Sequence, residues 1–174
     1  YLNGENIPNV TDNNAWYNLQ SGAWRTWNDD ASFGELWGKM YNGYALDEAI
    51  CPVGFRVPND LDFYTLAGSF GEFFYLGSLM KDDIVNNGYN TTGFSAKAMG
   101  NVADNGGMNN GPADFTASMY YFTRYGLTRE TTNYQLLGDP SKSRCFTLQG
   151  DDSANLTNCD RASGHYIRCI KYTE

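Results

Sequence analysis

The stretch "CPVGFRVPND" (residues 51–60) places a cysteine, two prolines and a glycine directly before "LDFYTLAGSF" (61–70). Proline holds its own φ at about −65° and pushes the residue before it towards an extended conformation. Asn59 or Asp60 can then cap a helix, because the apolar residues that follow recur at roughly helical spacing. The sequence therefore predicts a fixed backbone between Cys51 and the start of a helix.

Composition limits the class of protein. The 174 residues are predicted to form one domain, and an aromatic content of 16% with only 18% charged residues favours short strands and polar loops. The net charge of −8 argues against nucleic acid and against an anionic membrane. No apolar run approaches the roughly 20 residues of a membrane span. The opening "YLNGENIPNV" resembles the middle of a domain, so we expect part of a longer surface protein, with an N-terminal strand trimmed away.

The remaining segments predict an α+β domain, with two short helices packed on one side of twisted antiparallel strands that are joined by long loops. Within the first 33 residues, "NGEN" (3–6) and "WNDDAS" (27–32) are interpreted as turns, and 34–50 is interpreted as a strand or irregular structure with a helical turn. A second helix is expected at 72–83, weakened by Gly77, and then a long loop at 84–114. Strands are expected at the following positions: 93–99, 115–123, 143–150 and 165–172.

The four cysteines indicate the compartment. There is no CxxC pair and only one histidine, so a zinc site is disfavoured. An even number of cysteines in a polar, aromatic-rich chain favours two disulfides and an oxidising environment. The alternative is four buried free thiols in a cytosolic protein. The residues themselves leave all three disulfide connectivities open.

Several motifs along nearly the whole chain point to one family: "NIPNVTDNNAW" (6–16), "GELWGKMYNGYA" (34–45), "CPVGFRVPNDLDFYTL" (51–66), "TTGFSA" (91–96) and "GHYIRCIK" (164–171). They resemble the Fibrobacter succinogenes major paralogous domain, a family of bacterial secreted and surface domains. The resemblance implies a C-type lectin-like fold and a place on the bacterial outer surface. It also implies disulfides Cys51–Cys169 and Cys145–Cys159, with Cys159 in the turn before the last strand.

Calcium is considered because many C-type lectins bind sugars through it. The resemblance would place oxygen ligands at Asp139 and Asn155. Asp151 and Asp152 could add two more, although "GDDS" (150–153) is more typical of an exposed turn. Leu156 stands where a further carboxylate would be needed, and calcium takes six to eight oxygens. We therefore expect no metal and no other cofactor.

No catalytic centre is expected. His165 is interpreted as a packed histidine on the last strand, and no second histidine could support it. The adjacent carboxylates Asp29–Asp30 and Asp82–Asp83 are interpreted as solvated turn residues rather than a glycosidase pair.

The leading hypothesis is a non-enzymatic, extracellular recognition or adhesion module that binds a glycan or protein of a host or cell surface. We expect the ligand near 120–165, because segment 123–144 is the one locally positive region and joins two predicted strands. The residues proposed to contact it are Arg124, Tyr125, Tyr134, Asp139, Asp151, Asp152 and Asn155. If this surface does not bind, the loops around Trp24 and Trp27 are the next candidate.

Two other functions are considered. The chain could be a hypervariable display protein of the kind diversified by retroelements, which use this fold to present variable side chains. It could also be an oxidase similar to the formylglycine-generating enzymes, which need a reactive cysteine pair with copper.

Overall fold

The computed structural model describes residues 6–47, 50–71, 73–82, 88–97, 100–109, 119–123, 139–149 and 152–171. Within these ranges the helices are α1 (Asn13–Asn18), α2 (Ala31–Trp37), α3 (Asp60–Phe70) and α4 (Phe73–Met80), with 3-10 turns η1 (Trp27–Asp29) and η2 (Gly43–Asp47). The strands are β1 (Trp24–Arg25), β2 (Met40–Asn42), β3 (Phe55–Arg56), β4 (Asn101–Val102), β5 (Met108–Asn109), β6 (Met119–Thr123), β7 (Lys142–Leu148), β8 (Ala154–Asp160), β9 (Gly164–His165) and β10 (Ile170–Lys171).

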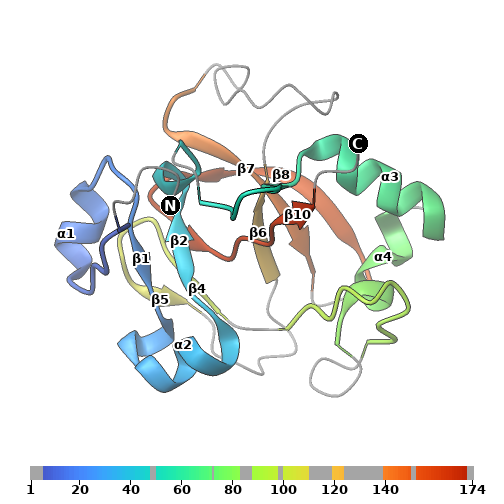
Figure 1. Ribbon diagram of the computed structural model, residues 1–174, viewed down its shortest axis with the longest axis horizontal. Coiled ribbons are helices and arrows are strands. Elements are labelled where there is room, and N and C mark those ends of the chain that lie inside the picture. Colours follow the sequence, from blue (N-terminus) through green and yellow to red (C-terminus); the bar gives the residue numbers. More distant parts are fainter. Residues whose placement is uncertain are drawn as a thin grey trace.

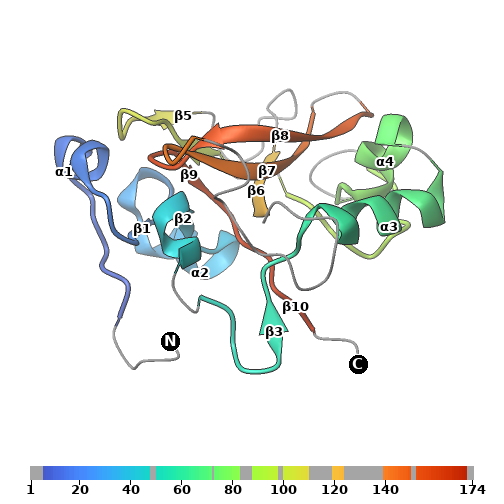
Figure 2. The ribbon, with the colours of Figure 1, turned by 90° about the horizontal axis from the view of Figure 1, so that it is seen from above.

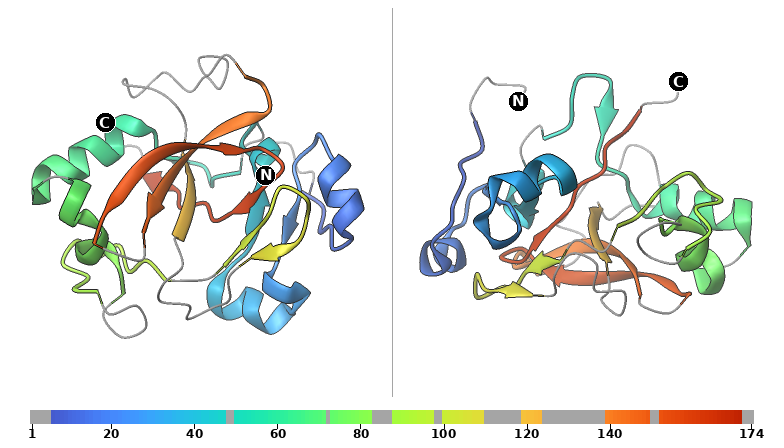
Figure 3. Two further views of the ribbon diagram at one scale, coloured as in Figure 1. Left: turned by 180° about the vertical axis from the view of Figure 1, so that it is seen from behind. Right: turned by 90° about the horizontal axis from the view of Figure 1, so that it is seen from below.

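The described strands form three antiparallel sheets, with orders β1-β2-β9-β4-β5, β10-β3 and β6-β7-β8. Helices α1 and α2 lie at one end of the molecule, and α3 and α4 lie at the other, with the strands between them (Figures 1 and 3). The mixed α+β class is therefore confirmed, but the expectation of two helices on one side is wrong. Strands β3 and β10 form a ribbon that projects from the rest of the strands (Figure 2).

Helix α3 begins where the sequence predicts. The Asn59 side chain accepts a hydrogen bond from the Asp62 backbone N–H, and the Asp62 carboxylate accepts one from the Asn59 N–H at 2.7 Å. This reciprocal capping box satisfies two backbone groups that the first helical turn leaves without partners. The Arg56 guanidinium also donates to both oxygens of the Asp62 carboxylate, at 2.6 and 2.7 Å, so the cap is tied to β3.

Helices α1 and α2 were not predicted, because the first 33 residues carry turn signals and 34–50 were interpreted as a strand or irregular structure with a helical turn. Each has an aspartate as its N-cap: Asp12 accepts from the Ala15 N–H at 2.7 Å, and Asp30 accepts from the Ser32 N–H at 2.8 Å. An Asp in a polar segment favours both a turn and a helix start, so composition alone does not separate the two. The Asp30 hydrogen bonds from Ser32 also lower the pKa of this carboxyl.

The strand predictions were partly wrong. Of the expected strand at 93–99, the described residues 93–97 contain only an isolated bridge between Ala96 and Lys81, whereas β4 and β5 lie in the segment expected to be a loop. The expected strand at 165–172 is divided into β9 and β10, which belong to different sheets. Strand β8 was not predicted at all, although its seven residues pair fully with β7.

Two apolar clusters hold these elements together. The larger includes Trp16 and Met40 from one end of the molecule and Phe63 and Phe146 from the other, with the last two rings stacked at 3.9 Å between centroids. The smaller surrounds both disulfides and includes Leu46. Among the described helices, none combines the length and hydrophobicity that crossing a membrane would require.

Candidate functional site

Both disulfides implied by the resemblance are present. Cys51 is joined to Cys169, 118 residues away, and Cys145 is joined to Cys159 across the β7–β8 hairpin. Cys159 lies inside β8, so the expectation that it occupies a turn is wrong. Both pairs fit a protein that folds in an oxidising compartment.

The described residues of the expected ligand-binding region near 120–165 lie mostly in strands β6, β7, β8 and β9. Arg124, Tyr125 and Tyr134 lie outside the described residues, and so does Asp151. The predicted binding surface of these four residues therefore stays a prediction.

The positive character expected for segment 123–144 is reduced by ion pairs. Lys142 forms an ion pair with Asp160, and Arg144 pairs with the buried Asp60 of α3 at 3.1 Å. Burial raises the pKa of Asp60, and the Arg144 guanidinium opposes that rise. Arg161, which follows β8, adds no charge to this surface, because it is buried with its guanidinium over the Tyr44 ring.

Of the oxygen ligands proposed for calcium that the structure describes, Asp139 and Asn155 lie at different ends of a strand. The Asp139 carbonyl accepts a hydrogen bond from the Lys142 N–H at the start of β7, whereas Asn155 pairs with Thr147 near the end of β7. At about 3.4 Å per residue, the five residues from Lys142 to Thr147 span ~17 Å, too far for the two side chains to share one ion. The exposed Asp139 instead accepts hydrogen bonds from the Ser141 backbone and hydroxyl, which lower the pKa of its carboxyl.

The hairpin turn that contains Asp152 is held against α4. The Gly77 N–H donates to the Asp152 carbonyl at 2.8 Å, and a Cβ at Gly77 would come within 2.5 Å of that oxygen. Gly77, predicted to weaken the helix, is thus what allows α4 to approach this turn. The Asp152 side chain itself is exposed.

The titratable residues that were considered for catalysis and that the structure describes are buried or are engaged in ion pairs and helix caps. His165 is buried, as expected, and burial lowers its pKa to about 3. Asp29 pairs with Arg25, and Asp30 caps α2, so these two carboxylates have separate roles. Asp82 is only 8% exposed, which contradicts its assignment to a solvated turn.

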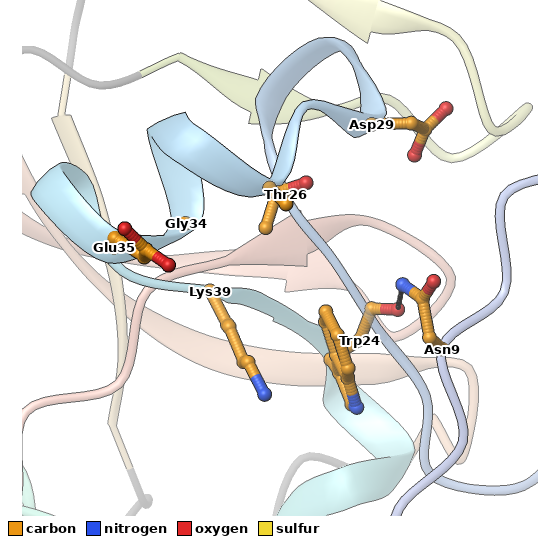
Figure 4. A pocket seen from close by; sticks show the side chains of 8 residues that line it. Asn9, Trp24, Thr26, Asp29, Gly34, Glu35 and Lys39 are labelled. Carbon is orange, nitrogen blue, oxygen red and sulfur yellow. Dashed lines mark hydrogen bonds between the residues drawn. The ribbon is translucent and has the colours of Figure 1, made fainter.

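A pocket of about 310 Å³ lies beside β1 and α2 and contains several polar groups (Figure 4). Trp24 and Thr26 come from β1 and the residue after it, and Glu35 comes from α2. Lys39 lies just before β2, and Asn9 contributes from the extended segment that precedes α1. Asp29, Ala31 and Gly34 complete the lining.

Local hydrogen bonds fix the tryptophan of this pocket. The Trp24 indole N–H donates to the Ile7 carbonyl at 2.9 Å, and the Asn9 side-chain amide donates to the Trp24 carbonyl at 3.0 Å. The Lys39 ammonium lies 3.6 Å from the centroid of the Trp24 ring, which is close enough for a cation–π interaction. The indole therefore offers its apolar surface to the pocket, while its one polar group is already used.

A buried arginine holds the wall behind the pocket. Arg25 is 2% exposed, and its guanidinium donates to both carboxylate oxygens of Asp29, at 3.0 and 2.6 Å. The same guanidinium donates to the Asn13 side chain and to the Gly106 carbonyl, at 3.0 and 2.7 Å. Asp29 has a φ of 56°, so the turn that presents its carboxylate uses a left-handed residue. One side chain thereby joins α1, η1 and the β4–β5 turn.

A glycine sets the distance between α2 and β1. A Cβ at Gly34 would lie 2.5 Å from the Thr26 methyl carbon, so no larger residue fits without a shift. This close approach shapes the pocket floor.

Chemically, the pocket combines an apolar wall with the cationic Lys39, the anionic Glu35 and the Asp29 carboxylate, which is paired with Arg25. Lys39 and Glu35 form no ion pair with each other or with another described residue. Their ammonium and carboxylate groups can therefore act together as donor and acceptor towards a small polar ligand.

Trp24 was predicted from the sequence only as a second choice, and Asn9, Glu35 and Lys39 were not predicted. A usable signal was present in "ELWGKMY" (35–41), where two of the chain's scarce charged residues flank aromatic ones. Trp27, the other residue of that second choice, does not line the pocket and instead packs edge-on against Phe33, with centroids 5.3 Å apart.

The fold and these sites define a disulfide-linked α+β domain with a polar, tryptophan-walled pocket. A family model described as the Fibrobacter succinogenes major domain matches residues 1–171, and the chain belongs to this family. Searches of curated proteins and of solved structures find no match.

Proposed function

We propose that this chain is an extracellular, non-enzymatic recognition or adhesion module with a C-type lectin-like fold, which binds a glycan or protein of a host or cell surface. The observation that carries the proposal is the pocket, in which Trp24, Lys39 and Glu35 present an apolar wall, a donor and an acceptor. A few polar groups around an apolar surface are typical of small-ligand sites.

The disulfides support an extracellular setting on the bacterial surface. A covalent link between residues 118 positions apart suits a domain that must stay folded outside the cell, where thiols oxidise. All four cysteines are engaged in disulfides. That state supports a recognition module over an oxidase that depends on a reactive cysteine pair.

The first experiment is a glycan array probed with the full chain, with and without EDTA, together with a cell-capture assay. We expect saturable binding to a defined set of glycans or to a cell-surface protein, unchanged by EDTA. Absence of binding in both assays would overturn the recognition function.

The loop prediction has its own test. If residues 123–144 form the main contact, Tyr125→Ala and Tyr134→Ala weaken capture at least about tenfold, because aromatic side chains often dominate binding energy. The melting temperature is expected to change little. Normal capture by both variants would contradict a role for this segment and leave the Trp24 pocket as the ligand surface.

A further inference from the structure

We propose that the pocket formed by Asn9, Trp24, Thr26, Asp29, Glu35 and Lys39 binds a single neutral pyranose ring of a glycan, without calcium. The inference rests on the proposed recognition function and specifies its ligand class. It also places the sugar at the opposite end of the molecule from α3 and α4 (Figure 1).

The size of the pocket favours one ring. Its volume of about 310 Å³ lies at the lower limit of small-molecule sites, which run from about 300 to 1,000 Å³. A pyranose has one face dominated by C–H groups, and such a face packs well against an indole. Because the Trp24 N–H is already bound to Ile7, this residue offers a ligand apolar surface rather than a hydrogen bond.

The two charged groups match a pair of neighbouring hydroxyls. Glu35 and Lys39 reach the pocket from α2 and from the segment between α2 and β2 (Figure 4). The carboxylate can only accept hydrogen bonds and the ammonium can only donate them, whereas each sugar hydroxyl does both. A vicinal diol that lies along the indole can therefore use both groups at once.

Charge balance favours a neutral sugar over an acidic one. Lys39 and Glu35 cancel, and the Asp29 carboxylate is neutralised by Arg25. A uronic or sialic acid would add an anion beside Glu35, and the Arg25 guanidinium is already committed to four hydrogen bonds. A zwitterionic amino acid could also use Lys39 and Glu35, and it is the rival ligand that the experiment must separate.

The walls are fixed before a ligand arrives. The Trp24 indole is anchored to Ile7, the Asp29 turn is anchored to Arg25, and Gly34 keeps α2 against Thr26. Binding then has to order little more than the Lys39 and Glu35 side chains, which lowers its entropic cost.

The test titrates the full chain with neutral methyl pyranosides, observed through the Trp24 indole signal and by saturation-transfer NMR. A Kd of the order of 1 mM is expected for a ligand of this size. Glu35→Gln and Lys39→Met should each weaken binding at least about tenfold, because each removes a charged hydrogen-bonding group. The matched control is Lys97→Met, which removes a lysine that lies 5.1 Å from the Trp37 ring and does not line the pocket.

The proposal is overturned if no methyl pyranoside binds, if both pocket variants bind as well as the control, or if free amino acids or acidic sugars bind more tightly than neutral pyranosides. Thermal melts of each variant identify any that fail to fold. If Glu35→Gln and Lys39→Met still bind glycans on the array, the recognition function stands and the pocket assignment is wrong. If the unaltered chain bound neither the glycan array nor cells, the proposed recognition function itself would be wrong.

Discussion

The two ends of the molecule are held together by different kinds of interaction. Residues 6–47, which carry the pocket, contain no cysteine, and their elements are joined by buried polar groups such as Arg25 and Asn42. Asn42 is fully buried and uses its side chain in three hydrogen bonds, to Ser21, Ala23 and Ala45. Beyond residue 50 the chain also has ion pairs, such as Arg144–Asp60, but here it is in addition cross-linked by two disulfides, and Phe63 of α3 stacks on Phe146 of β7.

This contrast suggests that different interactions determine the stability of the domain and the shape of the Trp24 pocket. Covalent links and aromatic packing tolerate changes of pH and salt, whereas a polar network depends on every one of its partners. We therefore expect reductants to lower mainly the stability of the region beyond residue 50, which contains both disulfides. Single polar substitutions in the pocket region should change ligand binding as well.

The largest effect is expected from the long disulfide. Replacing Cys51 and Cys169 by Ala opens a loop of 118 residues and should lower the free energy of unfolding by about 4–5 kcal/mol, since chain entropy grows with loop length. Urea denaturation of both proteins under non-reducing conditions measures the difference.

The short disulfide is the matched control. Removing Cys145–Cys159, which spans 14 residues, should cost about 3 kcal/mol in the same experiment. If the short link proved the more stabilising, chain entropy would not be what separates the two bridges.

The second prediction concerns Arg25. Substituting Met removes hydrogen bonds to Asp29, Asn13 and Gly106 and should cost about 2–4 kcal/mol, because it leaves a carboxylate and a carbonyl without their donor. It should also weaken pyranoside binding, since Asp29 lines the pocket. Denaturation and NMR titration provide the two measurements.

Arg56→Met provides the comparison with the other end of the molecule. Arg56 also donates to both oxygens of a carboxylate, that of Asp62, but it lies in β3 and does not line the pocket. This variant should lose stability and retain pyranoside affinity. An equal loss of affinity in both variants would show that the two regions are not separable.

The helix after Pro58 could be predicted because its signals are local: two prolines, a capping asparagine and an apolar repeat occur within twenty residues. The division of 165–172 into β9 and β10 could not, because the alternating pattern does not reveal that β9 pairs with β2 and β10 with β3. Strand β8 could not be predicted for a related reason. Its residues are mostly polar and only Ala154 is fully buried, so the sequence shows no strand pattern, and pairing with β7 makes them a strand.

The pocket was harder to predict than the fold. Asn9, Trp24 and Lys39 are separated in sequence, and what brings them together is the pairing of β1 with β2 and the bridge between Asn9 and Trp24. The disulfide pairing, in contrast, followed from the family resemblance, since the residues alone allowed three connectivities.

The third prediction concerns the pairing of β2 with β9, which connects the two regions. His165 in β9 pairs with Tyr41 of β2, and burial lowers its pKa to about 3 from a usual value of 6.5. Between these values the unfolded chain binds the proton and the folded chain does not. The stabilising contribution is therefore complete above pH ~6.5 and is lost as the pH falls towards ~3.

From pH 7 to pH 5 this histidine should account for a loss of about 2 kcal/mol. His165→Phe, which keeps an aromatic ring but cannot titrate, should remove that part of the pH dependence. Urea denaturation of both proteins at each pH isolates the effect, because their carboxyl groups are the same. If the free energy of unfolding changed with pH in the same way in both proteins, the pKa of His165 in the folded protein would not be lowered.

The smallest effect is expected from calcium. Calcium needs six to eight oxygens at one point, but Asp139 and Asn155 lie at different positions along the β7–β8 hairpin, and Leu156 packs against the core. Millimolar calcium should therefore shift the melting temperature by less than about 2 °C relative to EDTA, since a ligand stabilises a fold only when it binds the folded state preferentially. A thermal melt with magnesium controls for ionic strength. A saturable upward shift that is specific to calcium would contradict this, and an EDTA-sensitive affinity for pyranosides would move the sugar from the Trp24 pocket to a metal site.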